Sequence, residues 1–310
     1  MLIADKLPPK RVDKTFFSSG RAAFSFLVGQ VIKPKKVYLP TFTCWSVVAA
    51  MARRFPDIPV EYYPVERDLT CLYPAQLHEG ELLHFIHYFG HENRCKLPAS
   101  DGTILEDASH SYMSDISPVG DYVFGSYRKL VKVGDGGFVQ GYFNPIYEPS
   151  RKLDTWLRYE AADWKDVREA ENMLDRDWQI ADISGQSLAV ILAANHDLIR
   201  LKRRANERFL AENITAGTPL IKYRPNECPL LHSRLFETKE ERDCLRAFLA
   251  AKGVYASIHW PTPQRIKESG AGIAGALWLE SHILCLPVSQ DYGLNDMEYI
   301  ALCIREWQGD

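Results

Sequence analysis

The first 140 residues alternate short apolar runs with stretches that favour helix. Runs of β-favouring residues occur at 37–39, 60–63, 82–89, 103–107, 122–124 and 137–140. Apolar residues at helical spacing follow Ser18 or Ser19, either of which is a good N-cap, and they do so again after Pro40. The run at 82–89 is apolar on both faces, as in a buried parallel strand. This alternation predicts a mostly parallel sheet covered by helices on both faces.

The pattern changes in the second half of the chain. Residues 146–178 are charged, with tryptophans on expected helical segments, and 184–208 have the pattern of one long helix. Further on we expect strands at 228–236 and 254–260, a helix at 239–252, and a final helix from Leu294 to Trp307 with Asn295 as its candidate cap. These elements predict a smaller α+β domain, so we expect domains at 1–200 and 201–310. Residues 1–15 are expected to form an arm with little structure of its own.

Composition narrows the functional classes. The chain has 310 residues, of which 46% are hydrophobic and 25% charged, as in a soluble globular protein. A formal net charge of −3 gives no support to nucleic-acid or anionic-membrane binding, and no apolar run reaches the length of a membrane span. The charged N-terminus, broken by prolines, does not have the pattern of a signal peptide. Seven cysteines without paired spacing argue against disulfide frameworks and zinc sites, so we expect a protein of the reducing cytoplasm.

The candidate functional residues gather where predicted strands end. Asp107 and His110 follow the strand at 103–107, at the strand end where open α/β sheets bind ligands. Ser126 and Lys129 lie between the strand at 122–124 and the glycine-rich turn Gly134-Asp-Gly-Gly137. Taken singly, Asp107 is as well explained by an N-cap or an Asx-turn, and Lys129 by an exposed turn. His84, His87 and His91 lack metal-ligand spacing and are expected to be core or strand-end residues.

The helix that opens on Ser19-Gly20-Arg21 supplies a third kind of group. Its first turn offers free backbone amides, a positive dipole end and a guanidinium to an anion. Alone, this is as well explained by an ordinary capped helix. Together with Lys129 and Asp107 it completes the set that a pyridoxal phosphate (PLP) site needs, because these groups provide a Schiff-base amine, a partner for the ring nitrogen and a phosphate cradle.

The order of these motifs closely resembles the DegT/DnrJ/EryC1/StrS family of PLP-dependent sugar aminotransferases, over nearly the whole chain. Ser19-Gly20-Arg21-Ala-Ala stands where the family has Ser-Gly-Thr-Ala-Ala, and Glu106-Asp107-Ala-Ser-His110 matches Glu-Asp-Ala-Ala-His/Gln. Lys129 precedes its glycine-rich turn as the family's lysine precedes Gly-Glu-Gly-Gly. Segments at 39–43, 87–90, 253–261 and 284–287 also fit the family pattern.

The resemblance implies a fold and a set of roles. The fold is the type I fold of PLP transferases, with a mostly parallel seven-stranded sheet between helices and a smaller C-terminal α+β domain. Lys129 would hold PLP as a Schiff base and move the substrate proton, Asp107 would pair with the ring nitrogen, and His110 would pack against the ring or its 3′-oxygen. The start of the first helix, from Ser19 to Arg21, would bind the phosphate together with Ser126. The site is expected to be built across the two-fold interface of a homodimer.

Four positions depart from the family pattern. Arg21 replaces a threonine, so it would contact either the phosphate or the substrate. Cys44 replaces the aromatic residue that covers the ring, which leaves Cys44 or its neighbour Trp45 for that role. Phe124 replaces the serine five residues before the lysine, and Ser126 is the hydroxyl that remains nearby. The family's asparagine at longer range has no clear counterpart near residues 182–186.

By this resemblance the chain is expected to move an amino group, with glutamate as donor, to a keto sugar carried on a nucleotide. The product would enter polysaccharide, lipopolysaccharide or natural-product synthesis. One alternative is a PLP enzyme of the same fold that performs elimination or dehydration, or that acts on an amino acid. Members that dehydrate sugars carry histidine at the lysine position, so Lys129 disfavours dehydration. The other alternative is a degenerate member that binds sugar or a partner protein without turnover, which the presence of both Asp107 and Lys129 disfavours.

Overall fold

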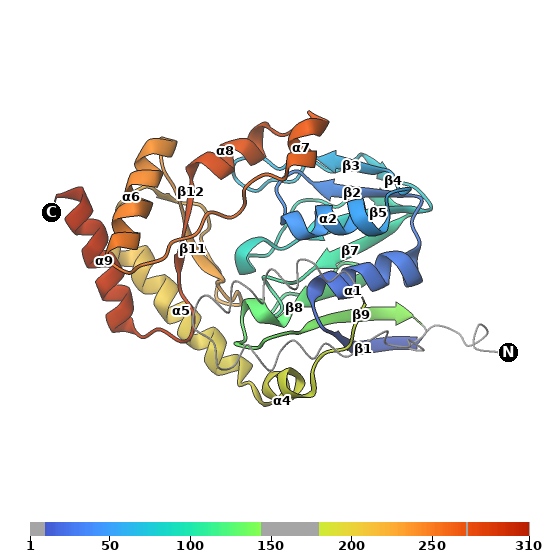
Figure 1. Cartoon of the computed structure of the whole chain (residues 1–310), viewed down its shortest axis with the longest axis horizontal. Helices are drawn as coiled ribbons and strands as arrows, with labels where there is room; N and C mark the ends of the chain where they lie inside the picture. Colours follow the sequence, from blue (N-terminus) through green and yellow to red (C-terminus); the bar gives the residue numbers. More distant parts are fainter. Residues whose placement is uncertain (1–9, 144–179, 271, 310) are drawn as a thin grey trace.

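A mostly parallel seven-stranded sheet forms the centre of the computed structural model, which describes residues 10–143, 180–270 and 272–309 (Figure 1). Its strand order is β1-β9-β8-β7-β5-β2-β3. The strands are β1 (Lys10–Phe17), β2 (Lys36–Pro40), β3 (Val60–Tyr63), β5 (Glu81–Ile86), β7 (Thr103–Asp107), β8 (Tyr122–Ser126) and β9 (Gly137–Phe143). The pairs among β2, β3, β5, β7 and β8 are parallel, whereas β9 runs antiparallel to β8 and β1 to β9. The predicted sheet is confirmed.

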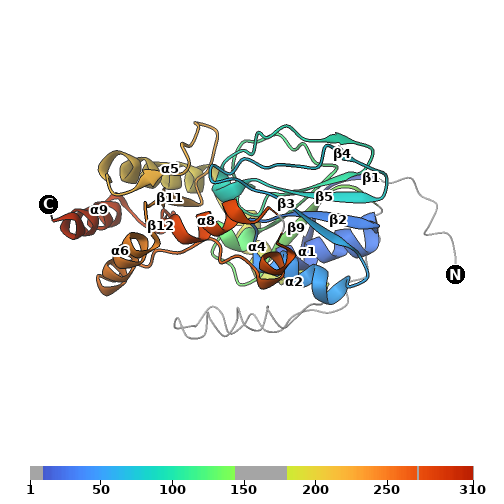
Figure 2. The same ribbon diagram turned by 90° about the horizontal axis from the view of Figure 1, so that it is seen from above.

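Alternating side chains of the central strands enter two hydrophobic cores. Leu39 of β2 and Leu82 of β5 lie under α1 (Gly20–Phe26), its continuation in a π-helix (Leu27–Ile32), and α2 (Trp45–Arg54). Their sequence neighbours Tyr38 and Leu83 belong to the core on the opposite face. Because strand side chains alternate between faces, the apolar runs bury both sides of the sheet. Figure 2 shows α1 and α2 together on one face.

A three-stranded antiparallel sheet organises the C-terminal part. Its strands are β10 (Thr218–Pro219), β11 (Leu231–Leu235) and β12 (Ile283–Pro287), and a separate two-stranded pair joins β4 (Gln76–Leu77) to β6 (Ala99–Ser100). The helices are α4 (Gly185–Ala193), α5 (His196–Asn213), α6 (Lys239–Ala251), α7 (Gln264–Ser269), α8 (Ala274–His282) and α9 (Leu294–Gln308). Residues of α5, α6, α9 and β12 form a third core. In Figure 1 these three helices lie on the side of the small sheet that faces away from the large one.

The predicted domain boundary at residue 200 falls within α5, which runs without a break from His196 to Asn213. The division at this residue stays a prediction. Among the described residues, no helix combines the length and the apolar character needed to cross a membrane. The helical segments expected at 146–178 lie outside the described residues.

The prediction of an arm with little structure is wrong for residues 10–15, which form most of β1. Phe16 pairs with Phe138, and Phe17 pairs with Gly137, across the neighbouring strand β9. This pairing joins segments about 120 residues apart in the sequence. By pairing with β9, β1 covers what would otherwise be an edge of the sheet. Because this pairing depends on residues far away in the sequence, the local pattern of residues 10–15 did not predict the strand.

Local capping corrects two predicted helices. The pattern at 184–208 is two helices instead of one, because Ala194 is extended and Asn195 begins a new helix by accepting a hydrogen bond from the Leu198 amide at 3.0 Å. The final helix is capped at Gly293 and not at Asn295. There the carboxylate of Asp296 accepts from the Gly293 amide at 2.8 Å, and this places the cap two residues before Asn295, while the helix begins at Leu294 as predicted.

The predicted strand at 254–260 is also wrong. Within it, the described residues form a single bridge, in which Ser257 exchanges two backbone hydrogen bonds with Cys285 of β12. Beyond this bridge the chain turns away from β12, and Trp260 reaches the segment that follows β7, where its ring stacks on His110.

Candidate active site

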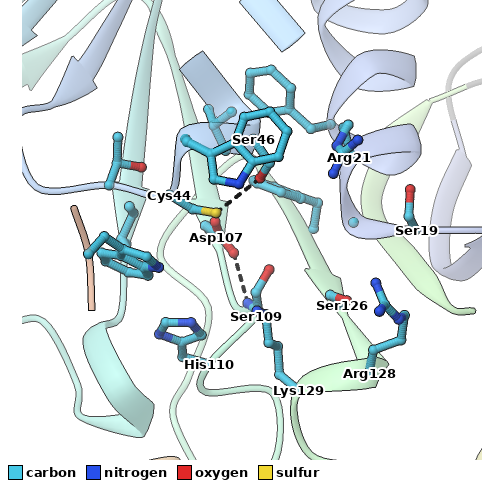
Figure 3. A pocket seen from close by; sticks show the side chains of 18 residues that line it. Ser19, Arg21, Cys44, Ser46, Asp107, Ser109, His110, Ser126, Arg128 and Lys129 are labelled. Atoms are coloured by element: carbon cyan, nitrogen blue, oxygen red, sulfur yellow. Dashed lines mark hydrogen bonds between the residues drawn. The ribbon is translucent and has the colours of Figure 1, made fainter. Parts of the chain in front are cut away.

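One cavity of about 190 Å³ is lined by residues from the carboxyl ends of β7 and β8, the starts of α1 and α2, and the C-terminal part (Figure 3). The nine residues singled out from the sequence all line it: Ser19, Gly20, Arg21, Cys44, Trp45, Asp107, His110, Ser126 and Lys129. In Figure 3, the labelled Arg21, Ser19, Ser126 and Arg128 line one side, and Asp107, Ser109 and His110 line the other. The carboxyl ends of adjacent parallel strands open at the same edge, which explains why residues so far apart in sequence meet here.

Asp107 ends β7 with its side chain buried. Its Oδ1 accepts a hydrogen bond from the Ser109 amide at 2.8 Å, and its Oδ2 lies 3.4 Å from Nε2 of His84 on the neighbouring strand β5. Burial acts to raise the pKa of this carboxyl, but the contacts with His84 and Ser109 outweigh burial and hold the pKa below its ordinary value. Asp107 therefore presents a charged acceptor to the cavity at neutral pH.

Glu106, the neighbour of Asp107, points to the opposite face of the sheet, as alternation along a strand requires. Its Oε1 lies 3.2 Å from Nε2 of His87, and its Oε2 accepts from the amides of Val119 and Gly120. These contacts outweigh burial, which acts in the other direction, and lower the pKa of Glu106. Glu106 therefore holds neighbouring segments together in the interior, whereas Asp107 presents its carboxylate to the cavity. The described residues contain no group of three or more metal-ligating side chains.

Lys129 ends a short 3₁₀ turn (Tyr127–Lys129) that directly follows β8. Tyr127 anchors this turn, because its side chain is buried and its amide donates to the Gly136 carbonyl at 3.0 Å. The Tyr112 hydroxyl donates to the Tyr127 carbonyl at 2.9 Å. The side chain of Lys129 is exposed and lines the cavity. A rigid turn therefore carries a flexible amine that can reach a bound group.

The glycine-rich segment lets the start of α1 approach the end of β8. A Cβ at Gly137 would lie 2.2 Å from the carbonyl carbon of Ser19, which is closer than side chains approach backbone. At Gly20, a Cβ would lie 3.1 Å from the Cβ of Ser126. Both contacts therefore favour glycine. Their result is that the Ser19 and Gly20 end of α1 lies against Ser126 at one end of the cavity.

Arg21 and Trp45 pack against each other at the cavity. The guanidinium carbon of Arg21 lies 5.4 Å from the centre of the indole ring, and Trp45 is 40% exposed. Cys44, the N-cap of α2, accepts a hydrogen bond at Sγ from the Ser46 hydroxyl at 3.2 Å. Both Cys44 and Trp45 line the cavity, so either is placed to cover a ring bound there.

His110 is held as a neutral imidazole. Burial, followed by the charge of Lys129, lowers its pKa to about 3. Its Nδ1 accepts from the amide of Phe89 at 3.2 Å, so the ring proton lies on Nε2. The ring of Trp260 stacks on His110 with centroids 5.3 Å apart and planes 22° apart. His110 is therefore a hydrogen-bond donor through Nε2 at neutral pH.

Six further polar or aromatic residues, not singled out from the sequence, also line the cavity: Phe24, Thr43, Ser46, Ser109, Arg128 and Trp260. Ser109 and Arg128 each lie one residue from a selected residue, so proximity within the motif would have indicated them. Thr43 belongs to the segment at 39–43 and Trp260 to the segment at 253–261, both of which fit the family pattern. Only the fold brings the second of these segments to His110.

Several solved structures share this architecture. A DegT/DnrJ/EryC1/StrS aminotransferase from Brucella abortus matches with a TM-score of 0.64 and 18% identity, over 97% of this chain and 87% of that protein. Spr1654 of Streptococcus pneumoniae, assigned as a sugar aminotransferase and solved in its PLP form, matches with a TM-score of 0.67 and 14% identity over 94% and 86%. PseC of Helicobacter pylori, an aminotransferase involved in pseudoaminic acid biosynthesis, matches with a TM-score of 0.65 and 12% identity, over 94% of this chain and 86% of that protein. The chain has the fold of these aminotransferases.

The resemblance predicted from the motifs is therefore confirmed at the level of the fold. No protein-family model and no curated protein matches the sequence. Identities below 20% show a shared fold and not a shared activity.

Proposed function

We propose that the chain is a PLP-dependent aminotransferase that acts on a keto sugar. The observation that carries this proposal is the meeting, in one cavity, of the Lys129 amine, the charged Asp107 carboxylate and a cluster of hydroxyl, amide and guanidinium donors. PLP requires these three kinds of group for its aldehyde carbon, its ring nitrogen and its phosphate.

Thr43 supports the idea that the cavity receives a bound group. Its side chain is 1% exposed, it lines the cavity, and its Oγ1 has no hydrogen-bond partner within the described part of the chain. A buried hydroxyl without a partner costs about 1–3 kcal/mol. A polar ligand in the cavity would supply the missing partner, so the residues present fit an occupied site better than an empty one.

The roles follow from the geometry of the chain's own groups. When bound, PLP supplies an electron-withdrawing ring that stabilises negative charge on the carbon that gains or loses the amino group. Asp107 would keep the proton on the ring nitrogen, because its own pKa is held low. Lys129 would attach the cofactor through Nζ and move the proton at the substrate carbon. His110 would donate from Nε2 to an oxygen of the ring, and the cluster at Ser19, Gly20, Arg21 and Ser126 would bind the phosphate.

The substrate class rests on the lining of the cavity and on the family resemblance. Besides the hydroxyls of Ser19 and Ser126, those of Thr43, Ser46 and Ser109 line the cavity and suit a polyhydroxylated ligand. We further propose that the keto sugar is carried on a nucleotide and that glutamate donates the amino group. The product would enter polysaccharide, lipopolysaccharide or natural-product synthesis, and the working unit would be a homodimer. The nucleotide, the amino donor, the pathways and the homodimer are proposed from the resemblance to the DegT/DnrJ/EryC1/StrS family.

Attachment of the cofactor is the first test. Purified protein is incubated with PLP, reduced with borohydride and digested, and the modified lysine is identified by mass spectrometry. We expect modification at Lys129, its loss in Lys129→Ala, and its retention in Lys132→Ala, which removes an exposed lysine from the same connection between β8 and β9. Protein that takes up no PLP would overturn the enzyme proposal and favour a sugar-binding protein without turnover.

A half-reaction then tests the type of chemistry. Protein loaded with PLP and mixed with glutamate should release 2-oxoglutarate and convert the cofactor to its amine form. Uptake of PLP at Lys129 without amino transfer from any amino acid would contradict transamination and favour elimination or another PLP reaction. Binding and turnover are thereby separated by two independent measurements.

A further inference from the structure

Two cysteines that belong to no part of the proposed active site meet beside a second cavity. The amide of Cys71 donates to Sγ of Cys95 at 3.1 Å, which places the two cysteines side by side. Since an N–Cα bond is about 1.5 Å long, the Cys71 Cα lies no more than about 4.6 Å from the Cys95 sulfur. Because the Cα of a cysteine lies about 2.8 Å from its own sulfur, the two Cα atoms lie no more than about 7.4 Å apart, close to the range of about 4.4–6.8 Å found in disulfides.

The two thiols differ in their access to solvent. Cys95 is partly exposed and lines a cavity of about 390 Å³, whose wall also includes His91 and Arg94. Cys71 is buried, with 6% of its surface exposed, and its Sγ lies 3.6 Å from the Leu69 carbonyl. A small oxidant in this cavity can therefore reach the sulfur of Cys95, whereas the sulfur of Cys71 is shielded from solvent.

Asn93 fixes both cysteines in this arrangement. Its Nδ2 donates to Sγ of Cys71 at 3.4 Å, and its Oδ1 accepts from the amide of Cys95 at 3.0 Å. The same Nδ2 donates to the Ile86 carbonyl at 3.0 Å, and the Asn93 amide donates to Nδ1 of His87 at 2.9 Å. The cysteine pair is thus held against the end of β5 by an ordered network.

We propose that Cys71 and Cys95 form a peroxide-reactive dithiol that closes to a disulfide. In the first step the Cys95 thiolate attacks a peroxide oxygen, so that an S–O bond forms, the O–O bond breaks and hydroxide leaves. In the second step the Cys71 sulfur attacks the sulfenic sulfur of Cys95, an S–S bond forms, the S–O bond breaks, and water leaves with the Cys71 proton. The two sulfurs together give two electrons to the peroxide, which is reduced.

The electrostatics agree with this division of roles. The contact with the Cys71 side chain lowers the pKa of Cys95 to about 6, whereas the same contact, followed by burial, raises the pKa of Cys71. The attacking group in thiol chemistry is the thiolate. Cys95 is therefore the attacking residue and Cys71 the resolving one.

The test uses the full-length wild-type protein and needs no variant for its main result. Reduced protein is treated with a small excess of hydrogen peroxide, quenched with an alkylating agent, unfolded and mapped by mass spectrometry. We expect a peptide link between Cys71 and Cys95, a fall from seven alkylatable thiols to five, and full reversal by dithiothreitol. Recovery of both cysteines in alkylated form after peroxide, with other thiols oxidised first, would overturn the proposal.

Variants assign the two steps. Cys95→Ser should abolish the link, and Cys71→Ser should stop the reaction at a sulfenic acid on Cys95 that dimedone traps. Cys244→Ser is the matched control, because Cys244 is exposed on α6 far along the chain from the pair, and it should leave the link unchanged. A Cys71→Ser protein without dimedone-trapped Cys95 would contradict the order of attack. PLP binding plays no part in these readouts, since neither thiol lines the cavity around Lys129.

Discussion

Gln290 donates a hydrogen bond from Nε2 to the carbonyl oxygen of Leu130 at 2.9 Å, and Leu130 directly follows Lys129. Gln290 is held in turn by Arg203 of α5, whose Nε donates to Gln290 Oε1 at 2.6 Å. Arg203 is 4% exposed and donates to two further backbone carbonyls. The C-terminal part of the chain therefore fixes the turn that carries the proposed cofactor lysine.

Replacing Gln290 by Met should weaken both the fold and the site. The guanidinium of Arg203 and the Leu130 carbonyl would each lose a partner, so we expect the free energy of unfolding to fall by about 1–3 kcal/mol. The yield of borohydride-trapped PLP at Lys129 should fall as well, because its turn loses an anchor. Urea unfolding and mass spectrometry measure the two effects. The control Gln264→Met changes an exposed amide, and its free energy of unfolding should stay within about 0.5 kcal/mol of wild type. If both variants have the same stability and the same yield of trapped PLP, the hydrogen bonds from Arg203 through Gln290 to Leu130 do not fix the turn.

Thr43→Val should separate ligand binding from stability. The variant removes a buried hydroxyl that has no partner in the described residues, so the free energy of unfolding without ligand should stay the same or rise. The affinity for PLP should fall by roughly 2- to 10-fold, the equivalent of one hydrogen bond. Absorbance titration with PLP and urea unfolding provide the measurements.

Thr41→Val is the matched control for this experiment. The Thr41 hydroxyl is equally buried, but it accepts from the Val65 amide at 3.0 Å. We therefore expect this variant to lose about 1–3 kcal/mol of stability and to keep its affinity for PLP. The reverse result, with Thr43→Val destabilised and its PLP affinity unchanged, would show that the Thr43 hydroxyl has a structural role.

Gly137→Ala should displace the start of α1 from the cavity. The added Cβ would meet the Ser19 carbonyl group at 2.2 Å, and backbone atoms on one side or the other must move. We expect a loss of about 1–3 kcal/mol or more in the free energy of unfolding, together with loss of PLP binding. Gly185→Ala is the control, since a Cβ there meets nothing within 4 Å and alanine favours the helix. If both variants bind PLP as the wild type does, the close approach at Gly137 does not shape the site.

The sequence predicted which residues would meet at one cavity better than it predicted the connections around that cavity. Asp107, Lys129 and the Ser19-Gly20 turn each follow or begin a regular element, and the carboxyl ends of parallel strands meet at one edge of a sheet. Local spacing therefore sufficed to bring them together. The strand β1 had no such signal, because its formation depends on pairing with β9 more than a hundred residues away. Trp260 was missed for the same reason, since it reaches His110 only through the packing of the two parts of the chain.

Capping decided the remaining differences. Asn195 lies inside a run with helical apolar spacing, and nothing in that spacing shows that its side chain would start a second helix. Asp296 caps the final helix through the Gly293 amide, so the carboxylate in the first turn determined the start and the nearby Asn295 did not. In both cases a single side-chain hydrogen bond outweighed a periodic pattern.

The stability of the protein should fall as the pH drops below 6.5, and His110 should account for part of that fall. Burial and the charge of Lys129 lower the pKa of His110 to about 3 and that of His259 to about 4, whereas the ordinary value is 6.5. Below pH 6.5 the unfolded chain therefore binds protons that the folded chain does not, and the free energy of unfolding decreases. For the nearly fully buried His110 this amounts to roughly 2 kcal/mol between pH 6.5 and pH 5.

His110→Gln tests this dependence, because a glutamine carbonyl can still accept from the Phe89 amide but does not titrate. Urea unfolding of both proteins between pH 8 and pH 5 is the measurement. The two curves should run in parallel above pH 7, and below pH 6.5 the wild type should lose stability more steeply than the variant. Parallel curves over the whole range would mean that His110 takes up its proton equally in the folded and unfolded chain, and they would remove the argument that it acts as a neutral donor beside Lys129.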